Sequence, residues 1–201
     1  MLKINPENPQ GRFIRRAVEV LERGGIIVYP TDTVYGIGCD IFNKKAIDRI
    51  YQIKGKSKKQ PLSFIVPNLK DISKYAYVSD PAYRLMRRIL PGPYTVVLPA
   101  TRMVPKKIAP VNKRTVGIRI PDNKVCMMLL EAYPNPIIST SANLSGSEIL
   151  NDPEVIAKEL GHLVDLILDA GMLGLEPSTV IDLTGEEPVV LRQGKGPFPL
   201  P

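Results

Sequence analysis

A run of hydroxyl and carboxylate side chains follows the first strongly apolar segment of the chain. Residues 31–38, Thr-Asp-Thr-Val-Tyr-Gly-Ile-Gly, come directly after residues 26–30, which we expect to form a short buried strand. Open α/β sheets bind ligands beyond the carboxyl ends of their strands, and glycines let a ligand approach the backbone closely. The segment, with Thr33 and Tyr35, is therefore a candidate substrate-binding loop. The alternative is a turn in which Asp32 and the threonines bond neighbouring backbone groups.

A second hydroxyl-rich segment lies at the end of another apolar strand. Residues 139–146 read Ser-Thr-Ser-Ala-Asn-Leu-Ser-Gly. In an extended chain Ser141 and Asn143 face the same side, where they would offer a hydroxyl and an amide to one ligand. A polar surface loop is the alternative, but two hydroxyl-rich strand ends in one domain favour a shared site.

Lysines occupy four of the six positions 54–59, and Gln60 and Pro61 follow them. Like charges this close repel one another unless an anion or water relieves them, so the segment either grips a polyphosphate or forms a solvated turn. A Walker phosphate loop is excluded because it requires a glycine five residues before Gly55, where this chain has Ile50.

Two arginines stand inside otherwise apolar strands. Arg119 lies in the expected strand 115–120, and Arg192 lies in the expected strand 189–192. A buried arginine needs a carboxylate, a phosphate or water. Each is therefore either half of a structural ion pair or a ligand for an anion.

The elements that must position these side chains alternate between helix and strand. Apolar residues at helical spacing predict helices over residues 13–21, 46–51, 83–90 and 155–160. Asp80-Pro81 and Asp152-Pro153 are typical helix starts, with the acid as N-cap. Strands are expected at 26–30, 62–66, 94–98, 115–120, 136–140, 164–168, 179–183 and 189–192. We expect a single α/β domain over residues 1–201, with its core at about 10–194 and a proline-rich tail at 195–201.

The composition excludes several classes of site. The 201 residues include two cysteines, too few for a disulfide scaffold or a structural zinc site. With one histidine and no tryptophan, a histidine-dependent triad, a multi-histidine metal centre or an aromatic stacking platform would each strain the inventory. No apolar run approaches ~18 residues and the first residues do not resemble a signal peptide. We therefore expect a cytoplasmic protein with no membrane span and no metal site of its own.

Charge is divided unevenly along the chain. Residues 1–135 carry 24 Lys and Arg against 10 Asp and Glu, whereas residues 136–201 carry 3 against 10. The excess of +14 in the first part predicts an anionic partner such as a nucleotide, phosphate or RNA, although basic faces in contact with water would give the same total.

Taken in order, these segments resemble the YrdC/YciO family. The matching strings are Tyr29–Gly38, Lys54–Lys56 with Pro61-Leu62, Val116–Pro121, Ser139–Gly146, Pro177–Asp182 and Leu191–Gly194. The family pattern is Lys-x-Arg followed much later by Ser-x-Asn. Ser141-Ala-Asn143 matches the second half, and Lys54-Gly-Lys56 matches the first half in part. Residues 5–9 and 172–179 are more similar to the YciO branch.

The resemblance implies a YrdC/RibB-like fold, in which helices pack on a twisted, open mixed sheet with a concave basic surface. The best-defined members make L-threonylcarbamoyl-adenylate from ATP, L-threonine and bicarbonate, for the N6-threonylcarbamoyladenosine of tRNA. The family is also associated with binding of double-stranded RNA or tRNA. We expect Mg²⁺ to arrive with ATP.

Carried over to this chain, the resemblance implies three sets of residues. Catalysis would fall to Lys54, Lys56 and Arg119; substrate would contact Thr33, Tyr35, Thr140 and Ser178; and the nucleotide would contact Lys54, Lys56, Gln60, Arg119, Ser141, Asn143 and Arg192.

Two positions depart from the family pattern. Lys56 replaces the arginine of Lys-x-Arg, so a bidentate fork becomes a point charge. Ile65 stands where some members place a histidine near threonine. A synthase is the leading hypothesis. The alternatives are a non-catalytic, double-stranded-RNA-binding protein of the YciO type and a related enzyme that takes a different amino acid.

Overall fold

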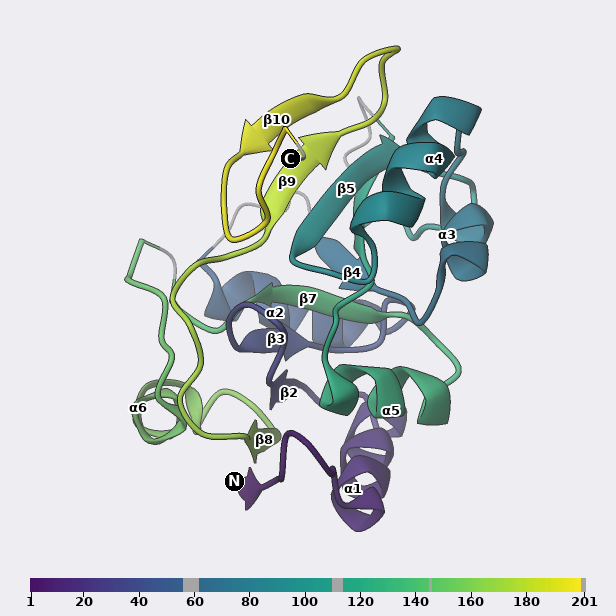
Figure 1. Ribbon diagram of the computed structural model, residues 1–201. Helices are drawn as coiled ribbons and strands as arrows, with labels where there is room; N and C mark the ends of the chain where they lie inside the picture. Colours follow the sequence, from purple (N-terminus) through teal and green to yellow (C-terminus); the bar gives the residue numbers. More distant parts are fainter. Residues whose placement is uncertain (56–61, 110–113, 145, 200–201) are drawn as a thin grey trace.

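The computed structural model describes residues 1–55, 62–109, 114–144 and 146–199, and within these ranges ten strands form one mixed sheet (Figure 1). The strands are β1 (Leu2–Lys3), β2 (Ile27–Tyr29), β3 (Gly36–Gly38), β4 (Ser63–Ile65), β5 (Tyr94–Pro99), β6 (Thr115–Arg119), β7 (Ile137–Ser141), β8 (Leu166–Asp169), β9 (Thr179–Asp182) and β10 (Val189–Arg192). Their order across the sheet is β1-β8-β2-β3-β7-β4-β6-β5-β9-β10. The sheet contains parallel pairs such as β4/β6 and β5/β9 and antiparallel pairs such as β3/β7. The expected mixed α/β sheet is confirmed.

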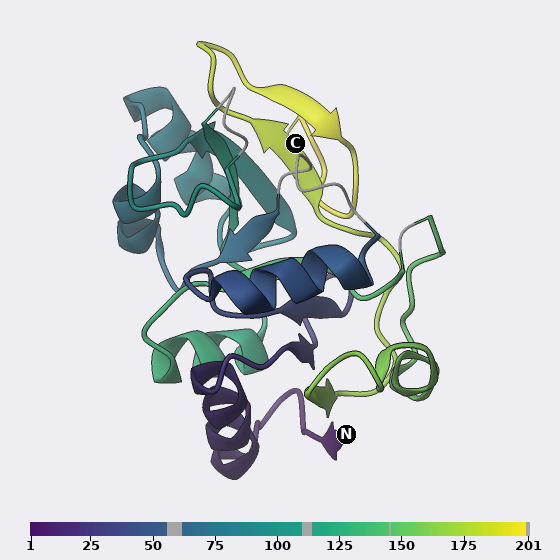
Figure 2. The same cartoon turned by 180° about the vertical axis from the view of Figure 1, so that it is seen from behind.

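Helices cover both faces of this sheet. They are α1 (Gly11–Glu22), α2 (Lys44–Ile53), α3 (Leu69–Tyr75), α4 (Asp80–Ile89), α5 (Lys124–Ala132) and α6 (Pro153–Leu160). Successive strand residues point to opposite faces, so Val28 packs in the core of α2, α3, α4 and α6, whereas Ile27 and Tyr29 pack in the core of α1 and α5. In Figure 2, which shows the molecule from behind, α2 lies in front of the sheet and runs across it. None of the helices in the described ranges is long and apolar enough to cross a membrane.

The two aspartate–proline pairs start their helices in different ways. Asp152 is the N-cap of α6, as expected, and its side chain accepts a hydrogen bond from the Glu154 backbone N–H at 2.9 Å. Asp80 is not the cap of α4, because the hydroxyl of Ser79 takes that place and accepts from Ala82 N–H. Asp80 instead lies in the first turn, where its negative charge interacts favourably with the helix dipole.

The two glycines of the expected binding loop lie in a strand. Residues 36–38 form β3, which pairs with β2 on one side and β7 on the other. A Cβ on Gly38 would overlap the carbonyl of Ile138 and approach the Tyr29 ring to 2.8 Å. These glycines therefore make room for the buried Tyr29 ring, whose hydroxyl donates to the Ile138 carbonyl at 3.1 Å. Close approach of a ligand to the backbone of this segment stays a prediction.

Residues on both sides of the expected core of residues 10–194 also bond to the sheet. Strand β1 pairs in parallel with β8. The backbone N–H of Lys195 donates to the Pro177 carbonyl at 2.9 Å, and the Tyr94 hydroxyl donates to the Pro197 carbonyl at 3.0 Å. The segment that follows β10 is thus held against β5 and β9.

The two cysteines are core residues, as expected. Cys39 and Cys126 are both fully buried and neither forms a disulfide. Burial raises the pKa of both thiols, which keeps them protonated and unreactive.

Candidate functional site

Residues of both hydroxyl-rich segments line one cavity of about 370 Å³. Its described wall consists of Thr31, Thr33, Val34, Tyr35, Gly36, Leu62, Ser63, Thr95, Val97, Gly117, Arg119, Ser139, Thr140, Ser141, Ile149, Pro177, Ser178, Val180 and Arg192. The charged members of that wall, Arg119 and Arg192, are both cations. Hydroxyls supply most of the remaining polar groups, so the cavity is suited to a polar anion.

The loop after β2 is an internally bonded turn that also presents a hydroxyl to the cavity. The Thr31 hydroxyl donates to the Val34 carbonyl at 2.6 Å and accepts from the Thr33 backbone N–H at 3.1 Å. These bonds are the side-chain-to-backbone contacts considered as the alternative to a binding loop. They fix the loop, and the hydroxyl of Thr33 lies 3.0 Å from that of Thr31. The turn and the site therefore coexist.

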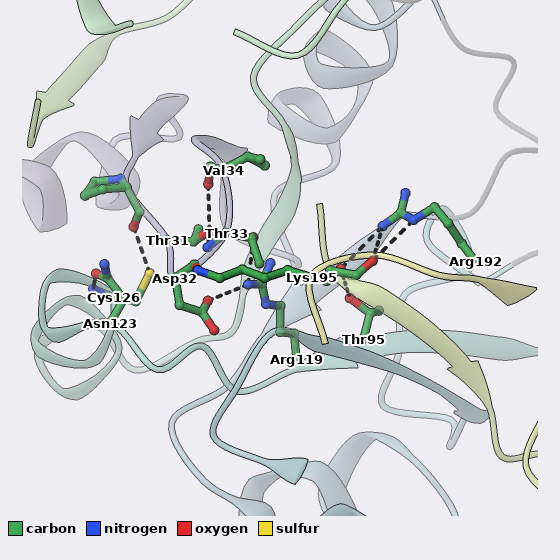
Figure 3. A network of polar contacts seen from close by, with 12 residues as sticks. Thr31, Asp32, Thr33, Val34, Thr95, Arg119, Asn123, Cys126, Arg192 and Lys195 are labelled. Carbon is green, nitrogen blue, oxygen red and sulfur yellow. Dashed lines mark hydrogen bonds and ion pairs between the residues drawn. The ribbon is translucent and has the colours of Figure 1, made fainter. Parts of the chain in front are cut away.

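Arg119 at the end of β6 joins this loop through an ion pair. Its side chain is almost fully buried, and one terminal nitrogen donates to the carboxylate of Asp32 and to the Thr33 hydroxyl, the latter at 2.8 Å (Figure 3). The pair is not bidentate: Arg119 Nε and Asp32 Oδ2 are buried without a hydrogen-bond partner among the described residues. Leaving a buried polar group unpaired costs about 1–3 kcal/mol, so a ligand that satisfies either atom would gain stabilisation.

Arg192 reaches the same cavity from β10. The strand's pairing with β9 is irregular between Val190 and Arg192. The Arg192 guanidinium donates to the Ser178 carbonyl at 2.8 Å, and the Ser178 hydroxyl lies 2.8 Å from that of Thr95 (Figure 3). Burial, and secondarily the positive charge of Arg119, lowers the pKa of Arg192. The two arginines thus repel each other across the cavity, and an anion between them would relieve the repulsion.

We call Arg119, Asp32, Thr33, Ser178 and Arg192 the arginine cluster. Its cations and hydroxyls come from the loop after β2, from β6 and from the β9–β10 region, which are distant in the sequence. All but Asp32 line the cavity.

A second group, the lysine cluster of Lys54, Ser141 and Asn143, lies at the end of β7. Lys54 is 2% exposed and its ammonium donates to the carbonyls of Ser141 and Asn143, at 2.8 and 2.6 Å, and to the Asn143 side-chain oxygen at 2.6 Å. The Ser141 hydroxyl donates to that same oxygen at 2.7 Å. Ser141 lines the cavity, but Lys54 and Asn143 do not. The cluster shapes the turn that carries Ser141.

Two further candidates differ in what they can offer. The Tyr35 hydroxyl donates to the Gly171 carbonyl at 2.7 Å and accepts from the Ala170 N–H at 2.9 Å, so it anchors the segment after β8 while other atoms of Tyr35 line the cavity. Burial raises the pKa of Tyr35 to about 12. Thr140 also lines the cavity. Lys56 and Gln60 lie outside the described residues.

Several residues at the site were not among those expected from the sequence. Thr95 and Ser63 line the cavity, and Ser63 donates to the Ser139 carbonyl at 2.8 Å. Alternation along residues 94–98 could have indicated that Thr95 faces away from Val96. Lys195, which was expected in a tail, donates to the Asp32 carbonyl at 2.7 Å. Ile65, by contrast, is buried in the core of α1 and α5 and is not part of the described wall.

Comparison with known proteins shows the family of this chain. Residues 19–194 match the family described as Sua5_yciO_yrdC, telomere recombination. The chain belongs to the Sua5/YciO/YrdC family. The match spans every cavity-lining residue and both clusters.

Two members show what the chain is similar to. The uncharacterized protein YciO of Escherichia coli is 44% identical over 96% of this chain and 94% of its own length, and a crystal structure of E. coli YciO superposes with a TM-score of 0.93 over 98% and 96% of the two chains. The threonylcarbamoyl-AMP synthase of Pyrococcus abyssi is 34% identical over 92% of this chain but only 55% of its own length. The structure of P. abyssi Sua5 complexed with L-threonine superposes with a TM-score of 0.89 at 33% identity, over 96% of this chain and 58% of that one.

Proposed function

We propose that the protein is an ATP-using enzyme of the threonylcarbamoyl-AMP synthase type, which joins L-threonine, bicarbonate and the adenylyl group of ATP and releases pyrophosphate. The observation that carries this proposal is the cavity itself. Its described wall combines two arginines with hydroxyls from two strand-end segments and contains no carboxylate.

The arginine cluster is suited to the phosphate chain. Arginine binds phosphate through charge-assisted hydrogen bonds, and the two arginines on the cavity wall, Arg119 and Arg192, are the candidate donors for it. The hydroxyls of Thr33, Thr140 and Ser178 are suited to the amino and carboxylate groups of an amino acid. That assignment is supported by the threonine complex of P. abyssi Sua5, which has the same fold.

Magnesium enters this scheme as the counter-ion of ATP. Within the described ranges, no group of three or more His, Cys, Asp or Glu side chains is placed to hold a metal by itself. The Asp32 carboxylate is paired with Arg119 and is not part of the described cavity wall, so the phosphates of ATP would hold the ion.

The reaction needs positioning and charge stabilisation more than proton transfer by a histidine. The threonine amine adds to the carbon of bicarbonate with loss of water, and the resulting carbamate oxygen attacks the α-phosphorus of ATP. The bond from that phosphorus to the bridging oxygen breaks, and pyrophosphate leaves with the electron pair. Arg119 and Arg192 would stabilise the negative charge that develops on the phosphate oxygens.

The experiment is a pyrophosphate-release assay with each substrate omitted in turn. We expect release only when ATP, L-threonine and bicarbonate are all present, with L-threonylcarbamoyl-adenylate detected by mass spectrometry. Replacing L-threonine with other amino acids tests the alternative of a different amino acid substrate. No pyrophosphate at high enzyme concentration with any amino acid would overturn the proposal.

A second candidate function is binding of double-stranded RNA or tRNA without catalysis. The observation that favours it is the excess of +14 over residues 1–135. Binding driven by phosphate neutralisation weakens steeply with salt. Measured affinity for tRNA should therefore fall as salt rises, and absence of binding even at low salt would remove this candidate.

A further inference from the structure

The segment that follows β10 has a firmly held backbone. The Thr179 hydroxyl accepts from the Gly194 N–H at 2.9 Å and donates to the Gly196 carbonyl at 2.5 Å. A Cβ on Gly196 would overlap the Tyr94 ring, whose hydroxyl holds the Pro197 carbonyl. These contacts hold the backbone of residues 194–197 against β5 and β9. The long side chain that projects from this segment therefore extends from a fixed backbone position.

That side chain is Lys195, and it extends to the loop after β2. Its ammonium donates to the main-chain carbonyl of Asp32 at 2.7 Å, although the residue as a whole is exposed (Figure 3). The Asp32 carboxylate is bound to Arg119. Figure 3 shows the Lys195 chain passing close to the Arg119–Asp32 pair. An ammonium that bonds a neutral carbonyl beside a cavity can exchange that bond for a stronger one to an anionic oxygen.

The distribution of charge points to the same residue. Residues 136–201 contain three cations, Lys158, Arg192 and Lys195, against ten acids. Two of the three, Arg192 and Lys195, are brought to the cavity or the adjoining Asp32 loop, whereas Lys158 lies on α6. Within the described residues neither Arg192 nor Lys195 forms an ion pair, so their charges remain for a ligand, whereas the charge of Arg119 is balanced by Asp32.

We propose that Lys195 is a ligand for the phosphate chain of the nucleoside triphosphate, supplied by the segment after β10 and held by the Asp32 carbonyl until substrate binds. The inference rests on the proposed function, because it assigns the third cation of the same site. A flexible lysine stem suits this role, since its point charge can follow phosphates that differ in position before and after pyrophosphate leaves.

The test compares binding of inorganic tripolyphosphate, ATP and AMP by isothermal titration calorimetry. Lys195→Met removes the charge but keeps the apolar stem, Lys195→Arg keeps the charge, and Lys158→Met is the matched loss of a cation elsewhere in the same acidic part of the chain. We expect Lys195→Met to weaken tripolyphosphate and ATP by about 10-fold and AMP much less. Lys195→Arg should restore most of the affinity, and Lys158→Met should bind like the wild type.

Each outcome separates this inference from the function on which it rests. Wild-type affinity for tripolyphosphate in Lys195→Met would overturn the role of Lys195 and leave the proposed function intact. An equal loss of affinity for all three ligands, together with a lower melting temperature, would show that Lys195 only supports the fold. That result would also overturn its role as a phosphate ligand. Tripolyphosphate binding that depends on Lys195 in a protein that releases no pyrophosphate would support the phosphate site and reject the synthase. A wild-type protein that binds neither tripolyphosphate nor ATP would reject both.

Discussion

Lys54 and Arg119 are both nearly fully buried cations next to the same cavity, but they differ in what they bond. In the lysine cluster, the ammonium of Lys54 donates to three oxygens of Ser141 and Asn143, and the Ser141 hydroxyl bonds the same amide oxygen. In the arginine cluster, Arg119 uses one nitrogen for Asp32 and Thr33 while its Nε has no partner among the described residues.

The difference shows why residue type alone does not identify a ligand-binding cation. The Lys54 and Ser141-x-Asn143 strings resemble the family pattern, yet here they bond mainly to one another and define a turn. In the arginine cluster, Arg119 Nε has no hydrogen-bond partner among the described residues, and both arginines lie on the cavity wall. We therefore expect changes in the lysine cluster to act on stability with little effect on anion binding. Changes in the arginine cluster should alter anion binding, and should lower stability as well where they break the buried Arg119–Asp32 pair. Three substitutions test this division, and a fourth tests Tyr35, a wall residue that belongs to neither cluster.

The largest effect is expected for Asp32→Asn, which breaks the arginine cluster. It leaves Arg119 buried without a counter-ion, and breaking such a pair costs about 3–5 kcal/mol, so the free energy of unfolding in urea should fall by about 3 kcal/mol. Affinity for tripolyphosphate, measured without Mg²⁺, should rise because the anion no longer competes with the Asp32 carboxylate. The control is Asp122→Asn at an exposed position. Weaker tripolyphosphate binding would contradict the role given to Asp32.

The next largest effect is expected for Lys54→Met, which breaks the lysine cluster. The substitution leaves the Ser141 and Asn143 carbonyls without their lysine donor, so the free energy of unfolding should fall by about 2–3 kcal/mol. Tripolyphosphate affinity of the folded protein should change little. Lys45→Met, at an exposed position on α2, the helix that Lys54 caps, is the control. A large loss of affinity with unchanged stability would instead place Lys54 among the phosphate ligands.

Arg192→Ala should show the opposite behaviour. Its guanidinium bonds Ser178 and forms no ion pair within the described residues, so the unfolding free energy should change by less than about 1 kcal/mol. Affinity for ATP should fall by about 10-fold, since a charge-assisted bond to phosphate is lost. Arg84→Ala, on the exposed side of α4, serves as the matched loss of an arginine. Unchanged ATP affinity would remove Arg192 from the site.

The smallest effect concerns Tyr35, a wall residue whose hydroxyl is bonded internally. Its pKa is raised from 10.0 to about 12 by burial, so the stability linked to its proton is complete below pH 10 and is lost as the pH rises toward 12. The unfolding free energy should fall over that range, and Tyr35→Phe should reduce the fall by about 1 kcal/mol. The exposed Tyr77→Phe is the control. An identical pH dependence in Tyr35→Phe and wild type would show that the hydroxyl reaches solvent.

Local patterns predicted most elements but not how they pair. The expected strand 189–192 coincides with β10, and the helices over 13–21 and 46–51 fall within α1 and α2. Strand β3 was missed because its Gly-Ile-Gly sequence has low strand propensity and is stabilised by pairing with β2 and β7. Helix α5 was missed because its nearly continuous apolar sequence gives no clear helical period.

The sequence by itself determined the family, the alternation of helices and strands, and most of the polar residues on the cavity wall, because periodicity and short motifs are local properties of the chain. Only the tertiary structure decided how those residues share their hydrogen bonds. It joined Arg119 to Asp32 across 87 positions, joined Lys54 to Asn143 across 89 and brought Lys195 to Asp32 across 163. A buried cation forms hydrogen bonds with whichever oxygen atoms the fold places near it. The residues next to it in the sequence do not indicate which oxygen atoms those are.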